Sequence, residues 1–309
     1  MKILITGSNG LLGQKLVYKL RSTPGIACIA TARGENRLVQ QEGYIYETLD
    51  ITDKKNVEEV FAKHQPDAVI NTAAMTNVDA CETEREACWL MNVTAVEHQV
   101  KTLEQLKSAQ AGYNPHFLHL STDFIFDGTH GPLDENEKPN PLSYYAESKL
   151  AAEKIVMASN LDWAIARTVL VYGIVDNMSR SNIVLWVKSS LEQGKTINVV
   201  DDQFRTPTLA EDLADGCILI TKKRALGIYN ISGKNFYSIL ELAQVVADYY
   251  HLDKNLIKPS KSADIKQPAK RPPITGFIID KAVKELGYNP HSFVEGIRIL
   301  EDQLRAMGK

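Results

Sequence analysis

Three evenly spaced glycines near the start constrain this chain more than any other feature. Gly7, Gly10 and Gly13 follow an apolar run at residues 2–5 and precede a helical pattern at residues 12–21. A glycine turn between a strand and a helix gathers free backbone N–H groups at the positive end of the helix dipole, and this combination binds phosphate. The turn therefore predicts that the chain opens with a dinucleotide-binding unit.

The spacing of the turn is G-x-x-G-x-x-G, whereas the commoner dinucleotide fingerprint is G-x-G-x-x-G. A glycine-rich turn without any ligand is the alternative, but the preceding strand and the following helix favour binding. We expect the cofactor contacts to come from the turn as a whole. Its predicted contact residues are Gly7, Asn9, Gly10, Leu11, Leu12 and Gly13.

Apolar runs alternate with helical patterns through the first half of the chain. The predicted strands are residues 2–5, 27–32, 44–49, 68–71, 117–121 and 163–169, and the predicted helices are 12–21, 54–63, 84–109 and 144–159. Strands that are apolar throughout suit a sheet covered on both faces, and strand–helix alternation produces parallel strands. The expected fold is α/β, a Rossmann-type doubly wound parallel sheet. Thr52 is the expected N-cap of the second helix.

The alternation weakens after residue 171, which indicates a smaller C-terminal substrate domain. We assign residues 1–170 to the dinucleotide-binding domain, with a return segment near 205–232, and residues 171–204 and 233–309 to the smaller one. In this part, residues 182–191, 238–250 and 292–307 are expected to be helices, and 229–231 a strand of the main sheet. Residues 260–273 are rich in Lys, Pro and Ser and predict an exposed loop.

The end of the second predicted strand bears on the choice of nicotinamide cofactor. Arg33 comes first after this strand, and a guanidinium suits the 2′-phosphate of NADP(H) as a bidentate partner. Arg37 adds a second positive charge nearby. Glu35 is the competing signal for NAD(H), because an acidic side chain accepts hydrogen bonds from the ribose hydroxyl. NADP(H) is therefore favoured, and NAD(H) stays open.

A tyrosine and a lysine four residues apart predict the catalytic pair. Tyr145 and Lys149 fall on one face of a predicted helix, where a nearby ammonium favours the phenolate and lowers the pKa of the phenol. Such a phenol can protonate a carbonyl oxygen while hydride reaches its carbon. Thr122, at the end of the preceding strand, is the expected partner hydroxyl. Tyr250 and Lys254 have the same spacing, but no hydroxyl-bearing strand precedes them.

Composition and charge exclude several other kinds of protein. The net charge is −3 with no basic block, which argues against nucleic acid as a partner. No apolar run reaches the roughly 20 residues needed to span a membrane, and none resembles a secretion signal, so a cytoplasmic location is expected. The four cysteines lack metal or disulfide spacing. His116 and His119 face opposite sides of a strand, so we predict packing roles and no metal site.

With these residues, the chain resembles the extended short-chain dehydrogenase/reductases, and among them most closely the dTDP-4-dehydrorhamnose reductases. The glycine turn, Tyr145 and Lys149 are common to the superfamily. The run at residues 121–128 and the pair of runs at 202–204 and 206–208 are specific to the narrower family. Further matching stretches lie at 71–74, 79–82, 91–93, 141–149, 167–168 and 171–173.

The resemblance implies further site residues. Asp50 and Ile51 would flank the adenine, Ala73 and Ala74 would line the cofactor, and Asn92 would lie near the active site. Residues 167–172 would border the sugar pocket. It also implies a nucleotide-sugar substrate and a homodimer.

Two positions depart from the family pattern. Leu170 stands where family members usually carry Trp, whose ring would stack on a sugar. Arg205 replaces a usually small residue, which changes the charge near the expected pocket. Members of the family require magnesium, but we find no set of acidic residues in this sequence that would bind it.

Three functions fit these observations. The first is an NADPH-dependent reductase that transfers hydride to a ketone of a nucleotide-linked sugar. The second is an epimerase or dehydratase that retains NAD, in which Asp123 would assist the tyrosine. The third is a non-catalytic regulatory subunit that binds the dinucleotide as a structural ligand. The sequence favours the reductase.

Overall fold

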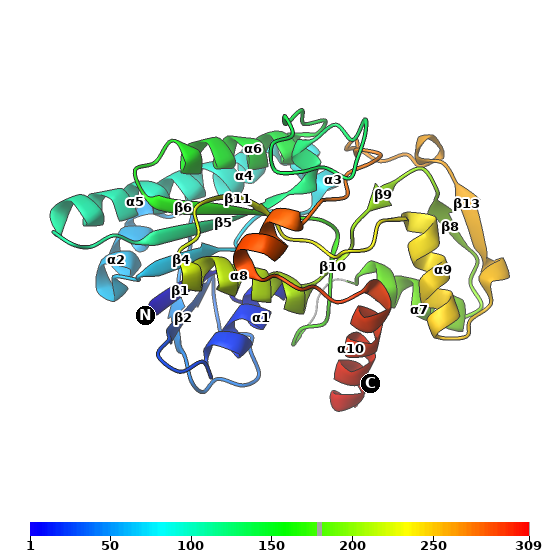
Figure 1. Cartoon of the computed structure of the whole chain (residues 1–309), viewed down its shortest axis with the longest axis horizontal. Helices are drawn as coiled ribbons and strands as arrows, with labels where there is room; N and C mark the ends of the chain where they lie inside the picture. Colours follow the sequence, from blue (N-terminus) through cyan, green and yellow to red (C-terminus); the bar gives the residue numbers. More distant parts are fainter. Residues whose placement is uncertain (178–180, 309) are drawn as a thin grey trace.

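The computed structural model describes residues 1–177 and 181–308, and its larger part is built on one seven-stranded sheet (Figure 1). All neighbouring strands are parallel, in the order β11-β6-β5-β4-β1-β2-β3. This order confirms the predicted doubly wound Rossmann-type sheet. The strands are β1 (Lys2–Thr6), β2 (Ala27–Ala32), β3 (Ile45–Thr48), β4 (Ala68–Asn71), β5 (His116–Thr122), β6 (Asp162–Thr168) and β11 (Gly227–Asn230).

Helices cover both faces of the sheet, and a separate apolar core fills each face. One core contains α1 (Leu11–Leu20) and α8 (Ala210–Lys223), and the other contains α2 (Lys54–His64), α5 (Ala95–Ala109) and α6 (Tyr144–Met157). Because both faces are covered, the side chains on both sides of the central strands β4 and β5 are buried, as their apolar runs predicted, whereas the edge strand β3 is partly exposed.

The region predicted as one helix over 84–109 is divided in the structure. It consists of α4 (Arg85–Trp89), a π-helical turn η1 (Leu90–Thr94) and α5, and α3 (Val78–Thr83) precedes it. A π turn inserts one residue without breaking the apolar pattern, so the sequence pattern does not reveal it. Asn92 lies in this turn.

The N-cap predicted for α2 is wrong by one residue. The Asp53 carboxylate accepts hydrogen bonds from the backbone N–H groups of Lys55 and Asn56 and caps the helix. The Thr52 hydroxyl instead donates to the Asp50 carboxylate at 2.6 Å. Both residues are favoured N-caps, but aspartate ranks above threonine, which agrees with the observed cap.

A second lobe lies beside the sheet and has its own apolar core (Figure 1). Its helices are α7 (Ile183–Glu192), α9 (Ile239–Tyr249) and α10 (Phe293–Ala306), and its two-stranded sheet pairs β8 (Ile197–Val200) with β13 (Ile257–Ser260). Capping boxes fix the starts of α9 and α10. In each box, the side chain of the serine (Ser238 or Ser292) accepts from the backbone N–H of the glutamate three residues later, and the glutamate side chain accepts from the backbone N–H of the serine.

Short elements connect the two lobes. The strand pairs are β7 (Val171–Tyr172) with β10 (Thr208–Leu209), and β9 (Phe204–Arg205) with β12 (Tyr237–Ser238). The 3-10 turns are η2 (Asp123–Ile125), η3 (Lys254–Leu256) and η4 (Ser262–Asp264), and η5 (Ala282–Leu286) is a second π turn. Ala282, Leu286 and Tyr288 pack in the core shared by α1 and α8. This packing departs from the division that placed all of 233–309 in the smaller domain.

Two further expectations concern single features of the chain. All four cysteines are free and buried, as predicted. Over the described residues, no helix is long and apolar enough to cross a membrane.

Candidate active site

The glycine turn lies at the carboxyl edge of the sheet, after the strand β1, which lies between β2 and β4. The chain passes from β1 to β2 and β3 on one side, and then crosses to β4 on the other side. Gly7 has φ of +73°, and a Cβ there would lie 2.8 Å from the backbone nitrogen of Ala73. A Cβ on Gly13 would lie 2.3 Å from the carbonyl oxygen of Gly7. Any larger residue at these two positions would therefore disrupt the turn. Crevices of this kind, at the switch point of an α/β sheet, bind ligands.

The loop after β2 is fastened to the glycine turn by one side chain. The Asn9 amide donates to the carbonyl of Glu35 at 2.9 Å and accepts from the backbone N–H of Arg37 at 2.9 Å. The side chains of Arg33, Glu35 and Arg37 are all exposed. The loop thus presents two guanidinium groups and one carboxylate next to the turn.

The residues expected around the adenine and nicotinamide also lie at this carboxyl edge. Ala73 and Ala74 follow β4, and Ala73 lies against Gly7. Asp50 and Ile51 follow β3, with Ile51 buried and Asp50 half-buried. Asn92 is different, because it is fully buried and its amide bonds the backbone of Met75 and the Ser148 hydroxyl. Asn92 therefore supports the loop after β4 and presents no free polar atom to a cofactor.

The predicted catalytic residues are brought together. Thr122 ends β5, while Tyr145 and Lys149 lie one turn apart on α6, whose N-cap is Ser143. The Thr122 hydroxyl is hydrogen-bonded to the Tyr145 phenol, and both residues are only 8% exposed. Burial is the main reason that the pKa of Tyr145 is raised, so the prediction of a lowered pKa is wrong for the protein without ligands. In the protein without ligands, this tyrosine is a neutral phenol, which is the form that donates a proton.

Lys149 points beneath the phenol into the protein. Its Nζ donates to the carbonyl of Leu120 at 2.6 Å and lies 3.3 Å from Nε2 of His119. Burial lowers the pKa of Lys149 to about 8. Burial, followed by the effect of Lys149, also lowers the pKa of His119. As predicted, His116 and His119 face opposite sides of β5, since His116 bonds the carbonyl of Ala225. The contact between His119 and Lys149 was not predicted from the sequence.

A buried ion pair lies directly behind Thr122. The Asp123 carboxylate accepts from the hydroxyls of Thr122 and Thr275 and lies 3.6 Å from Nε of Arg205. The guanidinium also donates to the carbonyls of Phe204, Pro272 and Pro273, at 2.7 to 3.0 Å. The change of charge expected from Arg205 is therefore balanced by Asp123 within the protein.

Arg167, the first residue of the predicted sugar-pocket border, is buried and does not reach a pocket. Its guanidinium forms two hydrogen bonds with the Glu153 carboxylate, at 2.7 and 3.0 Å. Leu170 adopts φ of +37°, a left-handed conformation that is unusual for a leucine.

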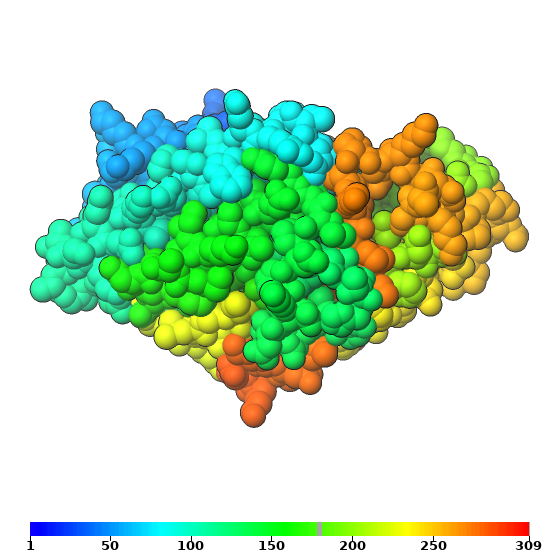
Figure 2. Space-filling model, turned by 90° about the horizontal axis from the view of Figure 1, so that it is seen from above, coloured from blue at the N-terminus to red at the C-terminus, as the bar shows by residue number. Residues whose placement is uncertain are grey.

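The loop predicted at 260–273 is only partly exposed, because its last residues cross to the sheet domain. Arg271 pairs with the Asp79 carboxylate at 2.7 Å, and Ala269 and Pro272 are buried. In Figure 2, this orange part of the chain lies against the cyan and green parts. The loop connects the second lobe to the active-site loops, and lysine-rich composition alone did not indicate this.

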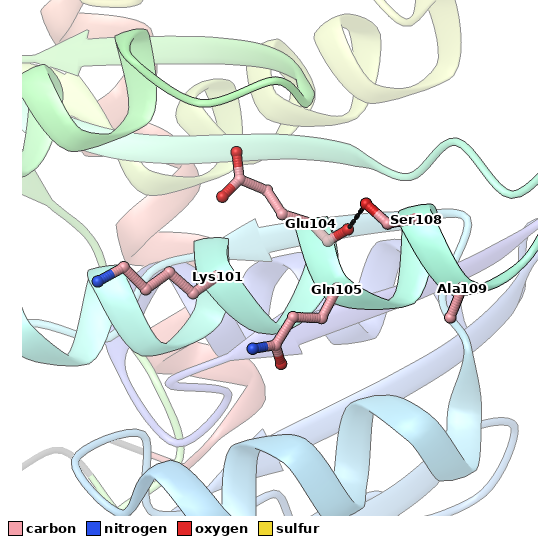
Figure 3. Close-up of a pocket in the computed structure, with 5 residues that line it drawn as sticks. All are labelled: Lys101, Glu104, Gln105, Ser108 and Ala109. Carbon is pink, nitrogen blue, oxygen red and sulfur yellow. Dashed lines mark hydrogen bonds between the residues drawn. The ribbon is translucent and has the colours of Figure 1, made fainter.

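Two other features do not form part of this site. The surface depression in Figure 3 is lined by one face of α5, with Lys101, Glu104 and Ser108 among its residues, and it lies away from the catalytic group. Tyr250 and Lys254, the second pair with catalytic spacing, do not share a helix, since α9 ends at Tyr249. Within the described part of the chain, no three His, Cys, Asp or Glu residues are grouped to hold a metal ion.

An NAD(P)-dependent oxidoreductase of the short-chain dehydrogenase/reductase type needs a dinucleotide turn and a phenol–amine pair at one edge of a doubly wound sheet. This protein has both, and it belongs to that class. Comparison with known proteins identifies the family. The chain belongs to the RmlD substrate binding domain family, whose model matches residues 1–305.

Several relatives and solved structures resemble the chain over most of its length. A probable low-salt glycan biosynthesis reductase of Haloferax volcanii is 30% identical, over 97% of each chain. The methionine adenosyltransferase 2 subunit beta of Xenopus tropicalis is 29% identical, over 84% of this chain and 75% of its own. A dTDP-4-dehydrorhamnose reductase from Clostridium acetobutylicum is 27% identical, covers 99% of this chain and 100% of its own, and has a TM-score of 0.84.

A structure of the reductase of the same name from Bacillus anthracis, in complex with NADP, has a TM-score of 0.82. It is 24% identical and covers 98% of this chain and 99% of its own, so this likeness concerns the fold alone.

Proposed function

We propose that the protein is an NADPH-dependent reductase that transfers hydride to a ketone of a nucleotide-linked sugar. The observation that carries the proposal is the shared position of Thr122, Tyr145 and Lys149 at the edge that holds the glycine turn. The bound cofactor supplies the hydride. Thr122 and Tyr145 hold the carbonyl oxygen, and Tyr145 gives it a proton as the hydride arrives at carbon. Lys149 restores that proton and holds the nicotinamide ribose.

The geometry of the turn fits a dinucleotide. A pyrophosphate needs backbone N–H groups at a helix start. The first residues of α1 offer them, and Gly10 places no side chain in the way. Asn9 holds the loop that carries Arg33 and Arg37 beside this turn. Two guanidinium groups favour the 2′-phosphate of NADPH, while Glu35 leaves NADH as a second cofactor.

The nucleotide-sugar substrate is proposed from the relatives. A glycan biosynthesis reductase and a dTDP-4-dehydrorhamnose reductase both match the whole chain. Their names indicate reduction of a sugar, and the site of this chain has the groups that such a reaction needs. The sugar would lie over Thr122 and Tyr145, between the sheet domain and the second lobe.

The test is NADPH oxidation with a set of nucleotide-linked ketosugars, measured for the wild type and for Tyr145→Phe. Loss of the phenolic proton should lower kcat at least 100-fold, in the range attributed to general acid catalysis. Tyr250→Phe is the matched control and should leave kcat unchanged. If the wild type binds NADPH but oxidises it with none of the sugars, the regulatory-subunit hypothesis replaces this one. If the purified protein retains NAD, the epimerase or dehydratase hypothesis replaces the proposed reductase.

The proposal also includes a cytoplasmic homodimer without nucleic-acid or membrane partners. Light scattering of the purified protein at several concentrations measures the oligomeric state, and a single species of 34 kDa would contradict the dimer.

A further inference from the structure

A row of buried polar side chains leads from α5 through the sheet to Lys149. The Gln99 amide nitrogen lies 3.4 Å from Oδ1 of Asn71, Nδ2 of Asn71 lies 3.1 Å from Nδ1 of His119, and Nε2 of His119 lies 3.3 Å from Nζ of Lys149. All four side chains are at most 3% exposed. Water cannot replace a partner here, so each donor must face an acceptor.

One end of this row is fixed by a backbone carbonyl, which can only accept. The carbonyl of Ala95 lies 3.1 Å from the Gln99 side chain, so the Gln99 amide nitrogen must face it. The same nitrogen faces Asn71, which must therefore present its oxygen to Gln99. The Thr6 hydroxyl donates to that oxygen as well, at 2.6 Å. The nitrogen of Asn71 is then directed at His119, because an amide has only one oxygen.

The orientation of Asn71 determines the tautomer of His119. Nδ1 of His119 accepts a hydrogen bond from Asn71, so it carries no proton, and the proton of the neutral ring is on Nε2. This N–H points at Nζ of Lys149. An ammonium has no lone pair with which to accept it, whereas an amine has one. The amine still has an N–H for the Leu120 carbonyl, at 2.6 Å.

We propose that His119 is a positioning residue, which donates from Nε2 to Nζ and thereby favours the neutral amine form of Lys149 in the protein without ligands. In the reaction proposed above, on which this step rests, Lys149 would alternate between ammonium and amine as it passes a proton to Tyr145. No other atom is transferred, and the proton comes from solvent in each turnover.

The other groups that face Lys149 do not reverse this assignment. On its own helix, Tyr145 is a neutral phenol and Glu153 is already paired with Arg167. Cys88 of α4 is a free cysteine near Lys149. From η2, which follows β5, Asp123 acts on Tyr145 but is paired with Arg205. Burial of Lys149 also disfavours the charged form.

The first test is the protonation of the His119 ring, read from long-range ¹H–¹⁵N correlation spectra of the full-length protein without cofactor. The His119 signals are identified by their absence in His119→Asn. We expect a proton on Nε2 and none on Nδ1, with no titration between pH 6 and pH 9. A ring protonated on Nδ1, or on both nitrogens, would overturn the proposal.

The second test is the titration of Lys149, followed by its ¹⁵Nζ shift and assigned by comparison with Lys149→Met. The amine should be the main form above about pH 8 in the wild type. His119→Asn keeps an acceptor for Asn71 and removes the N–H aimed at Lys149. The titration midpoint should then rise by about one pH unit, the effect of one ordinary hydrogen bond. An unchanged midpoint in His119→Asn would contradict the proposal.

His116→Asn is the matched control, because it changes a histidine of the same strand that faces the opposite side, and it should leave the midpoint unchanged. Both measurements need neither cofactor nor substrate. Their outcome is therefore independent of whether the proposed reductase activity is found.

Discussion

Replacement of Arg205 by methionine would isolate a buried carboxylate directly behind the proposed catalytic threonine. Both members of the ion pair have side chains that are only 4% exposed, and the guanidinium satisfies three backbone carbonyls besides Asp123. Removing one partner of a buried pair typically costs about 3–5 kcal/mol, because the remaining charge has lost its compensation. We expect Arg205→Met to lower the free energy of unfolding by about this amount at pH 7.5.

The loss should depend on pH in a defined direction. Burial raises the pKa of Asp123 even with Arg205 present, so the native state prefers the protonated carboxyl more than the unfolded state does. Stability from such a group is gained as the pH falls through its native pKa and lost as the pH rises. Without Arg205 the pKa of Asp123 rises further. The deficit of Arg205→Met should therefore shrink between pH 7.5 and pH 5.

The assay is urea unfolding of the wild type, Arg205→Met and the double variant Arg205→Met/Asp123→Asn, at both pH values. The double variant removes the isolated charge and should recover at least half of the deficit at pH 7.5. A double variant as unstable as the single one, together with an equal deficit at both pH values, would refute the electrostatic reasoning. The loss would then come from the unpaired backbone carbonyls alone.

Three further predictions concern the cofactor turn and the α2 cap. Gly13→Ala should weaken NADPH binding at least tenfold and lower the Tm, because the added Cβ would lie 2.3 Å from the carbonyl oxygen of Gly7. Calorimetric titration measures the binding. Asp53→Ala should cost about 1 kcal/mol in urea unfolding, and Thr52→Ala clearly less, since only Asp53 caps the helix. Arg33→Ser should raise the KM for NADPH about tenfold with an unchanged KM for NADH, and equal effects on both would contradict the 2′-phosphate contact.

The main sheet was predictable because its central strands are buried on both sides. The apolar runs at 27–32 and 68–71 match β2 and β4 residue for residue, and β11 joins the sheet where a return segment was expected. The π turn at 90–94 was not predictable, because one inserted residue leaves the helical pattern intact on either side. The predicted α2 cap was one residue too early, because Thr52 and Asp53 are both favoured caps and the higher rank of aspartate was not applied.

The proposed catalytic pair was predictable because its geometry is local. Four residues of helix fix the relative positions of Tyr145 and Lys149, whatever surrounds them. The contact of Lys149 with His119 is not local, because it depends on which helix covers that face of β5. The alternation along a strand gives the face of a histidine but not the side chain that meets it.

The environment of Arg205 is a second feature that depends on contacts between distant parts of the chain and could not be predicted from the sequence. A guanidinium at a usually small position suggested a changed charge near the substrate. In the structure its charge is balanced by Asp123, and its other donors hold Pro272 and Pro273, almost 70 residues further along the chain. Thr275 then bonds Asp123 from the same segment. The substitution therefore joins two loops behind the site and leaves its charge balance unaltered, so charge at this position gives no reason against a nucleotide-linked sugar.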